Sequence, residues 1–132
     1  MAKAWHFVGP TLRNGEPIPK NGEWLEYKGD LKMCESGLHA SVDPFDALTY
    51  APGATLCRVE VAGKIIKGYD KLVASRRKII KRRDVTDLLR VFACDCALSV
   101  AHLWAMPPIV KEYLTTRNES LWAAAGAAAG AA

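Results

Sequence analysis

The sequence predicts an α+β fold in which a mostly antiparallel sheet is followed by helices. Strand-like segments rich in β-branched and aromatic residues occupy residues 4–80, whereas the apolar residues beyond position 84 recur at helical spacing. The chain has 132 residues, half of them apolar, which is enough to bury one core. Strands first and helices last therefore favour a single domain, with a β-rich part over residues 1–83 and a helical segment over residues 84–132 packed on the sheet.

Turn residues divide the strand-rich part into short segments. The β-rich runs at residues 4–8, 23–27 and 38–41 are bounded by Gly, Pro or Asn-Gly. Residues 54–62 alternate apolar and polar side chains, which predicts a strand with one face inward. Residues 71–80 form a further strand. We expect it at an edge of the sheet, because lysine and arginine commonly protect exposed edges.

A short helix is expected inside this part, from Pro44 to about Tyr50. Ser41 or Asp43 can cap its first turn, and Pro44 suits the first helical position. The helix ends before Pro52, which cannot continue it.

Three helices are expected after the strands, over residues 85–105, 107–114 and 119–132. Asp84 is the expected cap of the first, and the last is an Ala-rich segment. The first helix is apolar on most of its faces, so we expect it to be buried on more than one side. Its helically spaced apolar positions are Leu88, Leu89, Phe92, Cys96, Val100 and Leu103.

Several functional classes are excluded by composition and motifs. The longest apolar stretch, residues 88–106, is interrupted by charged residues and a histidine, so it is not a membrane span. The chain has no Gly-rich phosphate loop, no His-Glu-x-x-His and no nucleophile-elbow pattern. Its four cysteines fit no disulfide spacing, and the start of the chain does not resemble a signal peptide. These features predict reduced thiols and a cytoplasmic location without membrane contact.

The net charge of +4 has one source. Residues 1–75 carry nine basic and nine acidic side chains, and residues 84–132 carry three basic and five acidic ones. The segment 76–83, which we call the basic strip, supplies six positive charges and is the expected binding surface for an acidic protein or for nucleic-acid phosphates. A solvated edge that resists aggregation is the alternative. The strip contains Arg76, Arg77, Lys78, Lys81, Arg82 and Arg83, of which Arg77, Lys81 and Arg83 would share one side of a regular strand.

The stretch 33–51 brings Cys34, His39 and Ser41 close together in sequence. A Cys/His pair can act as nucleophile and base, but no third orienting group is evident. The alternative we favour is that Cys34 is a small buried residue and that His39 hydrogen-bonds the turn backbone. A zinc site would also need Cys94 and Cys96, which lie about 200° apart on a helix and could not readily both ligate the ion. We therefore expect no metal and no cofactor.

The sequence contains a set of short motifs and an Ala-rich end that follows Trp122. The motifs are CESGLHA at residues 34–40, VEVAG at residues 59–63 and VAS at residues 73–75. These motifs resemble those of a family of small uncharacterised domains found mostly in bacteriophages and prophages. The resemblance implies an infected or lysogenic bacterial cell and no established activity. Since phage genomes are rich in compact inhibitors such as anti-CRISPR proteins, it implies a binding protein directed at a host or defence factor.

The layout of the strands is also similar to that of small ADP-ribosyltransferases of the rifampin-modifying and tRNA-phosphotransferase kind. In those enzymes an early aromatic-His strand contacts NAD, and a strand-helix unit with Ala and Tyr forms the nicotinamide wall. The chain departs from their pattern, because Val8-Gly9-Pro10 replaces the usual Gly-Thr and no acidic residue stands where the last catalytic strand would place one. The residues implied for NAD chemistry are His6, His39, Ser41, Tyr50 and Glu60.

The sequence thus predicts a binding protein first. The alternatives are an ADP-ribosyltransferase-like enzyme, or a degenerate NAD-pocket binder, and a nucleic-acid-binding protein that uses the basic strip.

Overall fold

The structure is a computed structural model that describes residues 2–131. The chain divides into two compact units, residues 1–85 and residues 86–132. The predicted α+β class is confirmed: an antiparallel sheet of five strands with a short inserted helix precedes the C-terminal helices.

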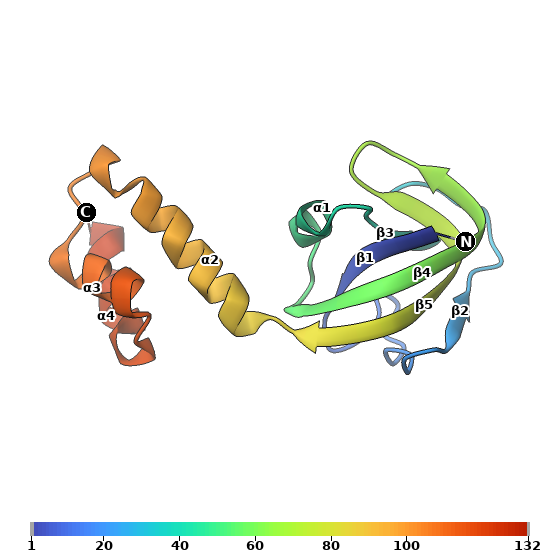
Figure 1. Cartoon of the computed structure of the whole chain (residues 1–132), viewed down its shortest axis with the longest axis horizontal. Helices are drawn as coiled ribbons and strands as arrows, with labels where there is room; N and C mark the ends of the chain where they lie inside the picture. Colours follow the sequence, from blue (N-terminus) through green and yellow to red (C-terminus); the bar gives the residue numbers. More distant parts are fainter. Residues whose placement is uncertain (1, 132) are drawn as a thin grey trace. The chain divides into compact units, whose positions relative to one another are not determined.

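The first unit contains the whole sheet (Figure 1). Its strands are β1 (Ala2–Val8), β2 (Trp24–Glu26), β3 (Leu38–Ala40), β4 (Thr55–Lys67) and β5 (Leu72–Asp84). β4 and β5 form an antiparallel hairpin, and β1 pairs with the other side of β4. β2 and β3 both pair with the free side of β5, one beyond the other.

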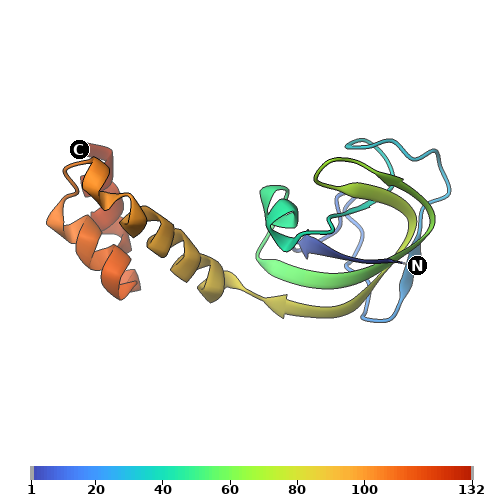
Figure 2. The ribbon, with the colours of Figure 1, turned by 45° about the horizontal axis from the view of Figure 1, so that its top comes forward.

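The sheet is strongly curled, as both views show (Figures 1 and 2). Ser41, directly after β3, pairs with Trp5 of β1 through reciprocal backbone hydrogen bonds of 2.7 and 2.8 Å. This single bridge joins β1 and β3, so that β1, β4, β5 and β3 form a small barrel-like ring, and it occupies the outer edge of β1 at Trp5. The core inside the ring consists of Ala4, Val8, Ala40, Cys57, Val59, Val61, Leu72, Ala74 and Ile79.

β5 lies in the middle of the sheet, so the expectation of an edge strand over residues 71–80 is wrong. It bonds β4 on one side and both short strands on the other. Its cations project from the faces of the sheet and do not guard an edge. Lysine and arginine are compatible with either position, and their frequency alone could not distinguish the two.

Two bulges shift the register of the β4–β5 hairpin. The first leaves Ile80 of β5 without a partner between the pairs Val59–Ile79 and Arg58–Lys81. The second lies on β4, where Gly63 has a φ of 73°, a conformation that favours glycine. β4 passes through this glycine and continues to Lys67, so the predicted strand end at residue 62 is too early.

The short helix α1 (Pro44–Thr49) begins as predicted. Asp43 is its cap, because Oδ1 of Asp43 accepts a hydrogen bond of 2.7 Å from the backbone N–H of Phe45. Ser41 is engaged in the pairing with β1 and does not cap the helix. α1 contacts β1 and buries Ala47.

The second unit is helical. It contains α2 (Thr86–Ser99), the 3₁₀ turn η1 (Ala101–Leu103), α3 (Pro108–Thr116), the 3₁₀ turn η2 (Glu119–Leu121) and α4 (Trp122–Ala131). α3 contacts both α2 and α4. No helix of residues 2–131 combines the length and the apolar character needed to cross a membrane.

Two expectations for α2 are wrong. The helix ends at Ser99, before the expected end at residue 105. The helix also buries only Cys94 among its described residues, whereas Leu88 and Phe92 are exposed. A unit of three short helices offers too few neighbours to cover an apolar helix on several sides.

Candidate functional site

The first half of the basic strip alternates across β5. Arg77 is paired with Val61, a core residue, and only 7% of Arg77 is exposed. Arg76 and Lys78, on either side of it, project from the opposite face. The alternation therefore separates adjacent cations into an inner and an outer set.

Beyond the bulge the alternation starts again. Arg82 is paired with the fully buried Cys57 and faces inward, whereas Lys81 and Arg83 are exposed on the outside. The expectation that Arg77, Lys81 and Arg83 share one side is wrong, because the unpaired residue of the bulge lies between them.

The two inward arginines hold segments of the sheet unit together. Nη1 of Arg77 donates a hydrogen bond of 2.5 Å to the carbonyl oxygen of His39, which connects β5 to β3. Nε of Arg82 donates at 2.8 Å to Oδ1 of Asn21, and its Nη2 donates to the carbonyl of Pro19. Burial lowers the pKa of Arg77 to about 10. These contacts give both side chains a structural role.

The outward cations of the strip share their face with residues of β1, β2 and β4. Six cations and two carboxylates lie there, a net of four positive charges, which equals the net charge of the whole chain. We call this surface the outer sheet face. It comprises Lys3, Trp5, Trp24, Glu26, Arg58, Glu60, Arg76, Lys78, Lys81 and Arg83.

Trp24 lies between two cations on this face. The guanidinium carbon of Arg76 is 4.3 Å from the centroid of the Trp24 ring, and Nζ of Lys78 is 4.8 Å from it. Nε of Arg76 is 3.2 Å from Oε1 of Glu26, without the alignment of a hydrogen bond. Nζ of Lys78 is 3.2 Å from Oε2 of Glu60. Both carboxylates of the face are therefore already engaged.

Trp5 forms a similar contact one row further along the sheet. The guanidinium carbon of Arg58 lies 4.5 Å from the centroid of its ring. The neighbouring cations Lys81 and Arg83 are exposed. A half-buried tryptophan beside exposed cations can receive both an anionic group and a planar one.

The sequence pattern did not indicate this arrangement. Trp5 and Trp24 are nineteen residues apart, and three pairings, β1–β4, β4–β5 and β5–β2, place them on one surface. The alternation at residues 54–62 gave part of the signal, since it placed Arg58 and Glu60 on one face of a strand. The registers of the other strands were needed for the rest.

His39 has the expected role in the turn before β3. Its Nε2 accepts a hydrogen bond of 3.0 Å from the backbone N–H of Cys34. The backbone φ of Cys34 is 68°, a value that residues other than glycine rarely adopt. Burial, followed by the charge of Lys71, lowers the pKa of His39, which favours the neutral ring that this bond needs. Cys34 itself is exposed, so its expected burial is wrong. The turn, closed by backbone bonds between Lys32 and Ser36, holds it away from the core.

The residues implied for NAD chemistry lie on different surfaces. His6 is on the inner face of β1, where burial, and then the charges of Arg77 and His39, lower its pKa from 6.5 to about 3. Glu60 projects from the opposite face of the sheet. Ser41 is buried where β3 meets β1. The structure brings His39 near His6, and it also brings His39 near Lys71, whose ammonium group lies over the Tyr50 ring. Glu60 lies apart from these residues.

Tyr50, the remaining residue of the set, belongs to an exposed cluster. Its hydroxyl donates a hydrogen bond of 2.5 Å to Oδ2 of Asp70, and Nζ of Lys71 lies 4.0 Å from the centroid of its ring. The bond to Asp70 raises the pKa of Tyr50, and a hydrogen bond with the Cys34 side chain raises the pKa of Lys71. The cluster joins segments about twenty residues apart, which no sequence motif indicated.

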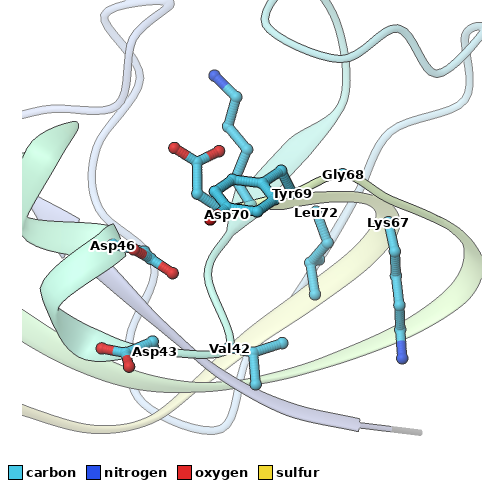
Figure 3. A pocket seen from close by; sticks show the side chains of 9 residues that line it. Val42, Asp43, Asp46, Lys67, Gly68, Tyr69, Asp70 and Leu72 are labelled. Carbon is cyan, nitrogen blue, oxygen red and sulfur yellow. The ribbon is translucent and has the colours of Figure 1, made fainter.

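A pocket of about 250 Å³ lies next to this cluster, where the turn between β4 and β5 approaches α1 (Figure 3). Val42 and Leu72 give it an apolar part, and the carboxylates of Asp43, Asp46 and Asp70 surround it. None of the five residues implied for NAD chemistry lines it. Its volume is below the usual range of pockets for small organic ligands, so it does not suit a dinucleotide.

The described residues form no group of three or more His, Cys, Asp or Glu side chains that could hold a metal ion. In α2, Cys94 is buried and Cys96 is exposed, as their helical separation requires. The cysteines therefore face different environments.

A family model described as a domain of unknown function (DUF7666) matches residues 2–91. The chain belongs to this family. The matched region covers the sheet unit and the start of α2, and it agrees with the expected resemblance to a family of small uncharacterised domains. No curated protein and no solved structure matches the chain.

Proposed function

We propose that this protein is a binding protein and that the outer sheet face is the surface that engages its partner. One observation carries the proposal: the net positive charge of the chain lies on this face, and its two carboxylates are already paired with cations. An anionic macromolecule would complement such a surface. The resemblance to phage domains supports a partner in the host cell, either a host or defence factor or the nucleic acid that such a factor handles.

The placement of the catalytic candidates supports binding over an NAD-dependent reaction. Catalysis needs its groups within hydrogen-bonding reach of one substrate. Here His6 faces the inside of the ring, Glu60 faces outward, and Tyr50 belongs to a third surface.

A pull-down from bacterial lysate with the full chain tests the proposal. Changing Lys81→Glu and Arg83→Glu together reverses two exposed cations and leaves the inward arginines intact. The matched control, Lys111→Glu with Arg117→Glu, makes the same change of charge on exposed residues of the helical unit. We expect the wild type and the control to retain material that the Lys81/Arg83 variant loses. Equal retention by all three proteins would refute the proposal.

A further inference from the structure

We infer that the partner of the outer sheet face is single-stranded nucleic acid, with phosphates on its cations and bases stacked on Trp5 and Trp24. This inference rests on the proposed function and narrows it to one class of partner.

The charge pattern is the first argument. The cations come from β1, β4 and β5 and lie in rows across the sheet: Arg58 is directly beside Lys81, whereas Lys3 and Lys78 lie on either side of Glu60. Only Arg76 and Lys78 are paired with a carboxylate of this face. A chain of phosphates, with one charge on every nucleotide, can satisfy several such rows at once and release its counterions in doing so.

The aromatic rings favour nucleic acid over an acidic protein. A strand of nucleic acid offers a planar base beside every anionic group, which matches a surface where tryptophan rings lie beside cations. Trp5 and Trp24 each have a guanidinium group at 4.5 Å or less from the ring centroid. Unpaired bases stack on tryptophan rings and on guanidinium planes, and proteins that bind single strands combine these platforms with a basic surface.

The spacing and shape of the face favour a single strand over a duplex. Trp5 and Trp24 are on β1 and β2, with β4 and β5 between them, which separates them by three inter-strand spacings, roughly 14 Å. One strand of a few nucleotides can therefore cross both rings. The face is the outside of a curled sheet, which a flexible single strand of nucleic acid can follow. A duplex would keep its bases stacked on one another and away from the tryptophans.

The test is a titration of a fluorescein-labelled oligothymidylate of about 12 nucleotides with the full chain, followed by anisotropy at several salt concentrations. We expect binding that weakens steeply between about 50 and about 200 mM salt. Trp24→Leu and Trp5→Leu should each weaken it by about 5-fold to 100-fold and leave the salt dependence unchanged, because stacking is not an ionic contact. Lys81→Ala should reduce the slope of log affinity against log salt by about 1.

Two variants serve as controls. Trp122→Leu removes an exposed tryptophan of the helical unit and should not change the affinity. Trp24→Phe keeps an aromatic ring and should retain most of the binding, so the stacking argument can be judged even if Trp24→Leu impairs folding.

The inference would be overturned if the oligothymidylate did not bind. It would also be overturned if the affinity were the same in the wild type and in all three variants Trp24→Phe, Trp24→Leu and Trp5→Leu. Tighter binding of a duplex of the same length would also overturn it. The lysate experiment judges the proposed function separately: a protein retained through Lys81 and Arg83, with no binding of the oligonucleotide, would leave the proposed function standing and refute this inference alone.

Discussion

Arg76 and Arg77 are adjacent in the chain and occupy opposite environments. Arg76 lies outside, stacked on Trp24 and paired with Glu26. Arg77 lies inside, bonded to the carbonyl of His39 and 7% exposed. The pleat of β5, and not the local composition, decides which arginine stabilises the ring and which one is offered to a partner.

The two faces should differ most in the free energy of unfolding that is lost when Arg77 or Arg76 is replaced by alanine. Arg77→Ala leaves the His39 carbonyl without its donor and opens a cavity, so we expect the free energy of unfolding to fall by about 2–4 kcal/mol. Arg76→Ala removes a surface ion pair and a cation–π contact and should cost about 1 kcal/mol or less. Urea unfolding of the two variants measures both values.

Arg77→Met serves as the control for volume, because it fills much of the same space without a donor. An unchanged or increased stability of Arg77→Ala would show that burying the charge costs more than its contacts return, and would contradict the role assigned to it.

The inner face should also respond to pH. The pKa of His6 is about 3 in the fold and 6.5 in the unfolded chain, so the unfolded chain takes up the proton first as the pH falls. Its stabilising contribution is complete above pH 6.5 and is lost toward pH 3, by up to about 1.4 kcal/mol for each pH unit. Between pH 6.5 and 5 the loss reaches about 2 kcal/mol, and His39 acts in the same direction.

Urea unfolding at pH 7, 6 and 5 tests this dependence. The variant His6→Leu lacks the titrating ring and should show a flatter profile over that window. The same slope in the variant and the wild type would assign the pH dependence to other groups.

A second pair of adjacent arginines gives a smaller contrast. Arg82→Ala breaks the hydrogen bonds to Asn21 and Pro19 that hold the loop before β2, and should cost about 1–2 kcal/mol. Arg83→Ala removes an exposed cation and should change stability by less than about 0.5 kcal/mol. Equal effects in urea unfolding would show that the inward side chain contributes no more than the exposed one.

The smallest expected effect is that of NAD. Because its candidate residues lie on separate surfaces, about 1 mM NAD should leave the melting temperature unchanged. A stabilisation that disappears in His39→Ala would restore the ADP-ribosyltransferase hypothesis.

The sequence was sufficient for several local features. Alternation at residues 54–62 identified most of β4, and Asp43 with Pro44 marked the start of α1. The bond between His39 and the turn was also foreseen. The sequence did not indicate the central place of β5, since strand order depends on pairings between distant segments. The separation of the basic strip was missed because one unpaired residue, Ile80, changes which side chains face inward.

For alignments of related chains, the bulge at Ile80 has a practical consequence. A relative that lacks this residue and has a regular strand instead would keep Arg82 on the inside and Arg83 on the outside, because the bulge adds one residue without a partner. A one-residue length change between Arg77 and Arg83 that keeps the bulge would reverse the facing of Arg82 and Arg83. A gap that removes the bulge is therefore compatible with the same surface, whereas a gap that keeps it would mark a relative with a different one.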